Sequence, residues 1–386
     1  MSYVSAAGQV ERGPHSVGNA TEERPRKRAK TDDGPSAFEK PPDWMKNFYK
    51  RYQKFNKYAL EAKLDLVECD SKSSSFSRHL VKACEGQIPE ELKKLKQTFS
   101  EFLGWCTDCG DVDWKKCEHP EWATPPVYLI HDMPGLSIYP NLLPQNVQIA
   151  LLDRLLHRDL SNPEHQTNVH THYEVPYPPP APGTNGPGSF FDASAKDLVY
   201  KPKQSHAAIN TERLLDKKLR WITLGGQYDW TAKEYPAGPP PPFPNDIKTL
   251  LEKIFPMKAE AAIVNFYSPG ETLSMHRDVS EECAQPLVSV SLGCEAVFVC
   301  GRGAEDATAS ETRISPIKLR SGDALLMSGE SRYAWHGVPK VLPETCPEWL
   351  QDWPAVGKNE ERFAAYKGWM KRKRVNLNVR QMFADE

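Results

Sequence analysis

The organisation of this chain is decided by one stretch, Asn265-Phe266-Tyr267-Ser268-Pro269-Gly270-Glu271-Thr272-Leu273-Ser274-Met275-His276-Arg277-Asp278. The apolar run from Ala261 to Tyr267 predicts a buried strand, and Pro269-Gly270 predicts a turn after it. Beyond the turn, His276 and Asp278 are two residues apart, so on an extended chain both side chains face the same side. Such a pair supplies two members of the set of two histidines and one carboxylate that holds non-heme Fe(II). Alone, the same pair is also typical of surface polar residues.

The composition predicts a soluble intracellular protein with a large core. The 386 residues are 39% hydrophobic and 26% charged, which suits one large catalytic domain with additions or two domains. The 49 basic and 51 acidic residues nearly cancel, so net charge neither favours nor excludes nucleic acid. Nine cysteines, no apolar leader and no run near roughly 18 apolar residues predict free thiols in a reducing compartment and no membrane span. We expect a monomer in the nucleus, the cytoplasm or both, and a mitochondrial location stays open.

The N-terminal part is predicted to divide into an arm and a helical extension. Residues 1–37 have few large apolar side chains, which predicts a disordered arm. Its basic run over 24–30 is typical of a nuclear-import signal, a phosphate-binding segment or a solvated charge run. Residues 38–125 form the predicted extension, with helices over 43–66 and 89–103. An aromatic stripe at helical spacing predicts that the first helix docks on the main domain; its members are Trp44, Phe48, Tyr52 and Phe55.

The extension also contains a group of metal-binding residue types, Cys106, Cys109, Cys117 and His119. Thiolates and imidazole are the preferred ligands of tetrahedral zinc, so a structural zinc site is one interpretation. The short spacing between Cys117 and His119 is unusual for zinc, and reduced structural cysteines are the alternative.

Residues 126–260 are predicted to contain short strands, helices over 145–158 and 246–255, and two proline-rich loops. A strand over 219–224 ends at a Gly-Gly turn, which places Tyr228 and Trp230 on the following loop. There the two rings suit stacking on a planar ligand and a plug over the core equally well. His170 and His172 have no carboxylate at a recognisable spacing and are predicted as surface loop residues.

The chain from Ala261 onward is β-rich, with strands predicted over 261–267, 287–292, 296–300, 316–320, 323–327 and 374–380 and a partly helical excursion over 348–370. Short strands joined by Gly-containing turns indicate a sandwich or barrel rather than βαβ units. His336 is placed after the 323–327 strand, and Gly337 beside it permits a close approach of backbone or ligand. A third potential metal ligand therefore follows the first two.

The last predicted strand reads Arg374-Val375-Asn376-Leu377-Asn378-Val379-Arg380. Its period-2 alternation puts the two arginines and two asparagines on one face and the apolar residues on the other. Guanidinium groups bind carboxylates bidentately and stay charged in a dry pocket, so this face suits a small dicarboxylate. An exposed edge strand with protective charges is the alternative.

Taken in order, four motifs resemble those of the AlkB family of Fe(II)/2-oxoglutarate dioxygenases: Asn265 with Tyr267, His276 with Asp278, His336, and Arg374 with Asn376 and Arg380. The likeness spans residues from about 200 to 383. The aromatic and basic helix near the N-terminus and Leu219-Arg220-Trp221 further resemble the eukaryotic AlkB homologue 1 branch. Four motifs in the family's order are far more specific than any one of them.

The resemblance implies a mainly β fold with flanking helices (α+β), built on a double-stranded β-helix or jelly roll over 261–386. Residues 126–260 would form the nucleotide-recognition lid region, and 126–386 together one catalytic domain. Fe(II) would be bound by His276, Asp278 and His336. 2-Oxoglutarate would be held by Asn265, Tyr267, Arg374, Asn376 and Arg380, with O₂ as the other co-substrate.

The implied reaction is oxidative demethylation of methylated nucleobases in tRNA or DNA, as in DNA repair or tRNA modification, with release of succinate, CO₂ and formaldehyde. Tyr228 and Trp230 would stack on the base, which such enzymes take out of the helical stack. Ser280 stands where some relatives have an acidic residue that helps to read the base, so the identity of the base stays open. Oxygenation of a protein side chain or another RNA modification, and an inactive nucleic-acid-binding scaffold, are alternatives. The intact ligand set argues against the scaffold.

Overall fold

The computed structural model describes residues 35–63, 65–69, 80–82, 89–104, 126–180, 188–236, 238–308 and 311–385. The basic run over 24–30 and the cysteine and histidine group over 106–119 lie outside these residues. The zinc and import interpretations of those two segments therefore stay predictions.

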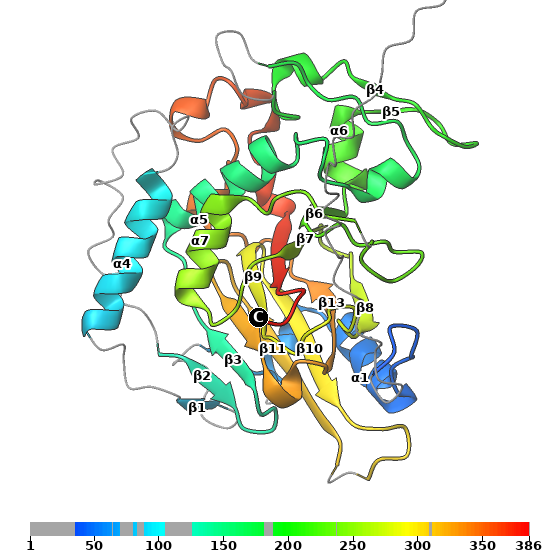
Figure 1. Cartoon of the computed structure of the whole chain (residues 1–386), viewed down its shortest axis with the longest axis vertical. Coiled ribbons are helices and arrows are strands. Elements are labelled where there is room, and N and C mark those ends of the chain that lie inside the picture. Colours follow the sequence, from blue (N-terminus) through cyan, green and yellow to red (C-terminus); the bar gives the residue numbers. More distant parts are fainter. Residues whose placement is uncertain are drawn as a thin grey trace, which may run out of the picture. The chain divides into compact units, whose positions relative to one another are not determined.

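Two antiparallel sheets form the centre of the protein (Figure 1). The larger sheet has the strand order β1-β2-β3-β12-β9-β14-β7-β6. Its strands are β1 (Leu80–Lys82), β2 (Tyr128–Ile130), β3 (Leu136–Tyr139), β6 (Trp221–Gly225), β7 (Ala261–Tyr267), β9 (Leu287–Gly293), β12 (Ala324–Met327) and β14 (Arg374–Arg380). The smaller sheet has the order β11-β10-β13-β8, made of β8 (Leu273–His276), β10 (Ala296–Arg302), β11 (Arg313–Leu319) and β13 (Trp335–Val341). A separate two-stranded hairpin consists of β4 (Val199–Tyr200) and β5 (Ile209–Asn210).

The two main sheets face each other, because Arg380 on β14 contacts Asp278 just beyond β8. This arrangement confirms the predicted double-stranded β-helix with flanking helices. Eight of its strands follow residue 260, and β6 and the short β1, β2 and β3 extend the larger sheet at its two edges.

Helices surround the sheets: α1 (Asp43–Lys54), α2 (Lys57–Glu61), α4 (Pro89–Gly104), α5 (Gln145–Asp153), α6 (Thr211–Arg213), α7 (Asn245–Ile254) and α8 (Glu348–Gln351). A π-helix over Arg154–Asp159 continues α5, so this helical segment ends close to the predicted residue 158. Buried Arg154 donates to the Phe102 carbonyl and to the Asp246 carboxylate, and thereby joins the α5 segment to α4 and α7. Three 3₁₀ turns after α8 make the predicted excursion partly helical: Gly357–Asn359, Ala364–Tyr366 and Met370–Arg372. Across the described residues, no helix combines the length and the apolar character needed to cross a bilayer.

Helix α1 packs on the outer face of the smaller sheet, as its aromatic stripe predicted (Figure 1). The deepest contacts come from Met45, Tyr49 and Tyr52, while Trp44, Phe48 and Phe55 are partly buried around them. The predicted helix over 43–66 is broken after Lys54. The side chain of Asn56 accepts a hydrogen bond from the Ala59 amide and so caps the separate helix α2.

Three details differ from the predictions. Strand β14 lies between β9 and β7 with both faces buried, which excludes an exposed edge strand. His336 lies within β13, a strand that was not predicted, because its glycine, proline and bulge hide the period-2 pattern. His170 is not a free surface residue, because its ring accepts from the Thr167 amide at 3.0 Å and contacts the Tyr177 hydroxyl at 3.0 Å.

Candidate metal and co-substrate site

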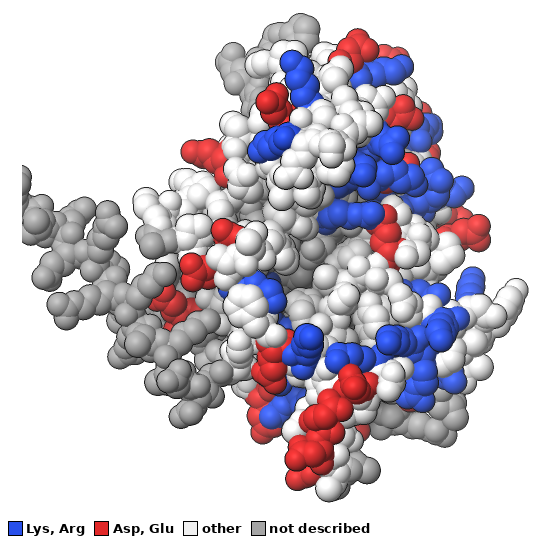
Figure 2. Space-filling view, turned by 90° about the vertical axis from the view of Figure 1, so that its right-hand side faces the viewer, with Lys and Arg blue, Asp and Glu red and all other residues white. Residues whose placement is uncertain are grey.

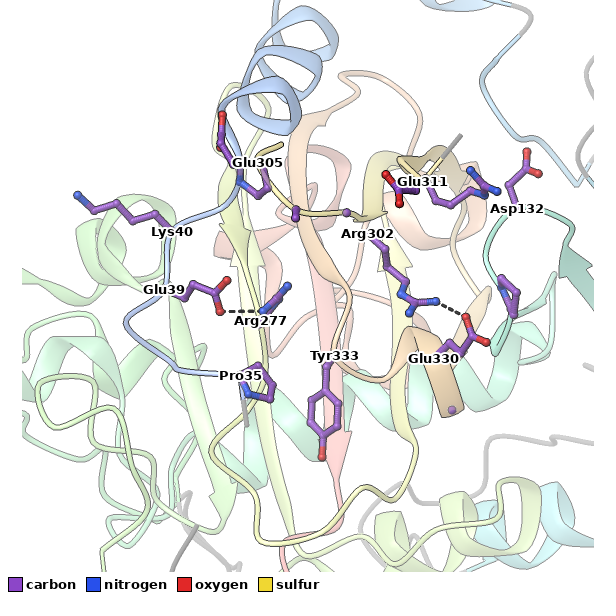
Figure 3. A pocket seen from close by; sticks show the side chains of 16 residues that line it. Pro35, Glu39, Lys40, Asp132, Arg277, Arg302, Glu305, Glu311, Glu330 and Tyr333 are labelled. Atoms are coloured by element: carbon purple, nitrogen blue, oxygen red, sulfur yellow. Dashed lines mark hydrogen bonds and ion pairs between the residues drawn. The ribbon is translucent and has the colours of Figure 1, made fainter. Parts of the chain in front are cut away.

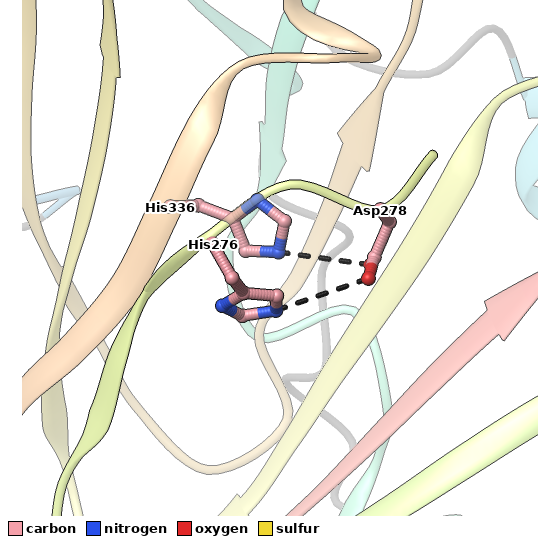
Figure 4. Close-up of side chains that lie close together, drawn as sticks. All are labelled: His276, Asp278 and His336. Atoms are coloured by element: carbon pink, nitrogen blue, oxygen red, sulfur yellow. Dashed lines mark ion pairs between the residues drawn. The ribbon is translucent and has the colours of Figure 1, made fainter. Parts of the chain in front are cut away.

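Pairing between β8 and β13 brings the two histidines together. His276 is directly opposite His336 in the ladder, so both rings project from the same face with centroids 4.3 Å apart. Asp278, two residues beyond His276, points at the same spot: its carboxylate oxygens lie 3.8 Å from His276 Nε2 and 3.7 Å from His336 Nε2 (Figure 4). One ligand atom from each of the three residues lies within 4.8 Å of the other two. The three side chains therefore offer two imidazole nitrogens and a carboxylate to one ion.

Backbone carbonyls decide which ring nitrogens face that spot. His276 Nδ1 lies 2.9 Å from the Ser274 carbonyl, and His336 Nδ1 lies 3.1 Å from the Ala334 carbonyl. Because a carbonyl only accepts, each Nδ1 carries the proton and each Nε2 presents its lone pair. Burial, reinforced by neighbouring His276, lowers the pKa of His336 to about 4, so this ring is neutral at pH 7. Both rings thus turn Nε2 toward the shared spot, the orientation in which a histidine ligates a metal ion.

Asp278 is fixed by a buried network of charges. Arg380 Nη2 donates to its carboxylate at 2.7 Å, and Arg332 Nη1 donates to its main-chain carbonyl at 2.8 Å. Glu281 lies between the same two arginines, 2.9 Å from Arg332 Nη2 and 3.0 Å from Arg380 Nε. Burial alone would raise the pKa of Asp278, but the positive charge of Arg380, with the two histidines, holds it below the ordinary value. The carboxylate is therefore ionised and oriented in advance of any metal.

Gly337 allows the two ligand strands to come this close. A Cβ at this position would lie 2.7 Å from the Leu273 carbonyl oxygen of β8, closer than real Cβ atoms approach. The close approach predicted beside His336 is confirmed, and the partner is the backbone of the strand that carries His276.

A polar wall faces the interior from the larger sheet. Arg374 is opposite Tyr267 in the ladder, and Asn376 is opposite Asn265, so all four side chains lie on one face. Ser291 on β9 accepts from Arg374 Nη2 at 3.0 Å, and Asn376 donates to Ser289 Oγ at 2.9 Å. Within the described residues, Arg374 Nε and Nη1 and the Tyr267 hydroxyl are buried without a hydrogen-bond partner. Buried donors without partners are rare, and these fit the carboxylate of a small acid.

The loop after β6 lies against the metal-ligand segment. Ser280 Oγ donates to the Lys233 carbonyl at 3.0 Å and lies 3.4 Å from the Tyr228 hydroxyl. The Tyr228 and Trp230 rings meet edge to face with centroids 5.0 Å apart, and Trp230 is 45% exposed. Sequence reasoning named Tyr228 and Trp230 as a pair on one loop and Ser280 apart from them, and the structure brings the three residues together. Exposed Trp230 is not a plug over the core.

Most of the chain is similar to proteins of one enzyme family. Residues 135–380 match the family model described as the 2OG-Fe(II) oxygenase superfamily. The chain belongs to this superfamily. It is 44% identical over 366 residues to "N6-methyladenosine RNA demethylase ALKB1" of Pyricularia oryzae, covering 90% of this chain and 97% of that one. It is 50% identical over 226 residues to "N6-methyladenosine RNA demethylase ALKBH" of Cryphonectria parasitica, covering 55% of this chain and 99% of the relative.

A third relative, "tRNA demethylase abh1" of Schizosaccharomyces pombe, is 39% identical over 267 residues, covering 67% of this chain and 82% of that one. The predicted AlkB-like membership is confirmed. The chain is an oxidoreductase that uses Fe(II) and 2-oxoglutarate.

Several residues of this site were missed by sequence reasoning. Ser289 and Ser291 carry a usable signal, because they alternate with valine and leucine along β9 and so share one face. Glu281 and Arg332 carry none, since only the fold brings residues 51 positions apart into an ion pair.

Replacing Gly337 by alanine should push β8 away from β13, because the new methyl group would overlap the Leu273 carbonyl. We expect a loss of about 1–3 kcal/mol in the free energy of unfolding, the usual cost of overpacking. Urea unfolding measures it. Gly104→Ala is the matched control, since a Cβ there meets nothing within 4 Å and its stability should change by less than about 0.5 kcal/mol. Equal stability of Gly337→Ala and the parent would contradict the close approach.

Proposed function

We propose that this chain is an oxidative demethylase of methylated nucleobases in tRNA or DNA. The observation that carries the proposal is the convergence of His276, Asp278 and His336 beside an aromatic loop. The names of the three relatives, two RNA demethylases and a tRNA demethylase, support the substrate class.

In this proposal His276, Asp278 and His336 hold Fe(II) through two Nε2 atoms and one carboxylate oxygen, which leaves other coordination positions open. Arg374 and the Tyr267 hydroxyl take the far carboxylate of 2-oxoglutarate with their unpartnered donors. Bound iron supplies the chemistry that couples conversion of 2-oxoglutarate and O₂ into succinate and CO₂ to hydroxylation of the methyl group, which then leaves as formaldehyde. Arg380, which is itself paired with Glu281, keeps Asp278 ionised and aimed at the ion.

The target base would enter beside Tyr228, Trp230 and Ser280. A base removed from its stack needs aromatic surface to replace the lost neighbours, and Trp230 and Tyr228 offer a face and an edge near the opening. His276 is the most exposed of the three ligands, at 37% for its side chain against 6% for His336, so the site opens on the side of β8. Ser280 offers a neutral hydroxyl where a carboxylate would favour a cationic base.

The face around β8 suits a polyanion. Figure 2 shows Lys and Arg side chains gathered in groups on both sides of a hollow on this face. Helix α1, on the same side of Figure 1, carries exposed Lys50, Arg51 and Lys54, and the region of α6 carries exposed Arg213 and Arg220. Phosphates attract such groups over distances longer than a hydrogen bond, so a nucleic acid strand could be drawn to the opening from either side.

Removal of one metal ligand tests the reaction. Purified His276→Ala, incubated with Fe(II), 2-oxoglutarate, O₂ and total tRNA or methylated DNA, should form neither succinate nor demethylated nucleosides above background, because one ligand of the ion is lost. Mass spectrometry of the nucleosides provides the measurement. His172→Ala removes an exposed histidine that does not belong to the metal-ligand group and should retain the parent's turnover. Undiminished demethylation by His276→Ala would rule out this ligand set.

Arg374→Gln should raise the KM for 2-oxoglutarate by on the order of 10²-fold or more, because a buried charged pair loses about 2–5 kcal/mol when one partner is truncated. Succinate formation at varied 2-oxoglutarate gives the value. Arg372→Gln, exposed and two residues earlier, is the control and should leave KM unchanged. If both variants keep the parent's KM, another residue holds the co-substrate.

Charge reversal on α1 tests the nucleic-acid surface. Lys50→Glu with Arg51→Glu should weaken tRNA binding and lower the slope of log Kd against log salt by roughly 0.7–0.9 for each phosphate that the protein no longer neutralises. Fluorescence anisotropy at several salt concentrations records both effects. Lys93→Glu with Lys96→Glu places the same charge change on exposed positions of α4 and should have a smaller effect. Equal effects of the two pairs would argue against a surface on α1.

A further inference from the structure

The two metal-ligand strands have an outer side that the proposed reaction does not use. Two neighbours of the ligands lie on this outer side: Arg277, which stands between His276 and Asp278, and Trp335, which precedes His336. The Arg277 guanidinium lies over the Trp335 ring, 4.4 Å from its centroid. One side chain thus spans from the segment that joins His276 and Asp278 to the residue that precedes His336.

A segment from the N-terminal extension closes this contact from outside. Glu39 Oε2 lies 2.8 Å from Arg277 Nη1 (Figure 3), and the Arg277 side chain is 19% exposed against 47% for Glu39. We call residues 35–42 the strap. The strap also contacts the loop after β6, which carries Tyr228 and Trp230. There Lys233 Nζ donates to the Ala37 carbonyl at 2.9 Å and lies 4.5 Å from the centre of the Phe38 ring.

Helix α1, which follows the strap, forms hydrogen bonds to the same two strands. The Tyr49 hydroxyl lies 2.9 Å from the Leu273 carbonyl on β8 and 3.2 Å from the Val338 carbonyl on β13, and its one proton can serve either. Trp335 is packed in the apolar cluster under α1 together with Met45 and Val299. The ring beneath Arg277 therefore cannot move independently of the core.

Strand β8 needs this support because its own pairing is weak. It is one of the two edge strands of the smaller sheet and is four residues long. It pairs with β13 only at His276 and Leu273, with a bulge between. No ladder bond extends to Asp278, so the backbone between the two ligands is not held by the sheet. The orientation of the Asp278 carboxylate relative to the two histidine rings then depends on the side chains that pack on the two sides of this backbone segment.

We propose that Arg277 is a positioning residue for the metal, clamped between Trp335 and Glu39 so that the His276–Asp278 segment keeps its orientation toward His336. The inference rests on the ligand set proposed above. It assigns the strap and α1 to the support of the metal centre, in addition to any contact with nucleic acid. Outer-shell partners of metal ligands typically contribute a factor of 10–100 in metal affinity.

The test uses the full chain, metal-free, titrated with Mn(II) by calorimetry and with Co(II) by visible absorption, which reports ligand geometry. Arg277→Gln should raise the Kd for Mn(II) about 10-fold and shift the Co(II) bands. Its melting temperature without metal should stay near that of the parent, since the fold keeps all of the core under α1. Arg277→Lys keeps a cation over the ring and should restore most of the affinity. Glu39→Gln should raise Kd by a smaller factor, about 3-fold, because it removes one of the two contacts on Arg277.

Arg302→Gln is the matched control. Arg302 lies in the same open hollow of about 900 Å³ and pairs with Glu330 rather than with a ligand strand's ring (Figure 3). Its removal should leave the Kd and the Co(II) spectrum unchanged. Arg277→Gln with the parent's Kd and spectrum, or Arg302→Gln with the same loss as Arg277→Gln, would overturn the proposal. If Arg277→Gln lowers the melting temperature of the metal-free protein, Glu39→Gln decides in its place, and an unchanged Kd there overturns the proposal.

The same titration separates this proposal from the ligand set. If the parent binds Mn(II), His276→Ala does not, and Arg277→Gln binds like the parent, only the clamp is wrong. If His276→Ala binds Mn(II) like the parent, the ligand set is wrong and the clamp is overturned with it.

Discussion

The pairing of β8 with β13 is the constraint on which the site depends. It puts His276 opposite His336, and the period of an extended chain then brings Asp278 to the same side. A shift of one residue in this pairing would turn His276 away from the interior and put Met275 or Arg277 in its place. The apolar residues Met275 and Trp335 resist that shift, because both are buried under α1 on the outer side. The N-terminal helix thus helps to specify a metal site that it does not touch.

Asp278 is positioned by two kinds of interaction, a buried network of ion pairs on its inner side and cation–π stacking of Arg277 on its outer side. On the inner side, Arg380, Glu281 and Arg332 form a buried set in which two positive and, with Asp278, two negative charges balance. Such sets cost desolvation energy and are weak evidence for stability, so orientation of the ligand is the better explanation for this one. On the outer side, Arg277 lies partly in solvent and works through stacking on a fixed ring, which tolerates exposure better than an ion pair does.

How much of this site the sequence predicts depends on how far apart along the chain the interacting residues lie. His276 with Asp278, and Arg374 with Arg380, were accessible because the period of a strand is local. The position of β14 in the middle of its sheet was not, since both faces of a central strand are buried and its polar alternation reads equally well as an edge. His336 was predicted as a ligand but its strand was not, because Gly337, Pro339 and the bulge obscure the alternation along β13. Glu281, Arg332 and Glu39 were missed, because each acts through a partner that only the fold brings near.

The buried charges of the interior leave one cation, Arg374, without an anionic partner among the described residues. Arg332 and Arg380 are matched by Glu281 and Asp278, whereas Arg374, 1% exposed, has no ion-pair partner among the described residues. Burial lowers the pKa of Arg374, which is the expected direction for a cation without a counter-ion. A divalent metal at the histidines and Asp278 would add further positive charge to the interior. A ligand with two carboxylates would offset both, with one end on Arg374 and the other at the metal. A monocarboxylic acid could satisfy only one of them. A preference for a dicarboxylate therefore follows from electrostatics, and it requires Arg374 to remain unpaired until the co-substrate arrives.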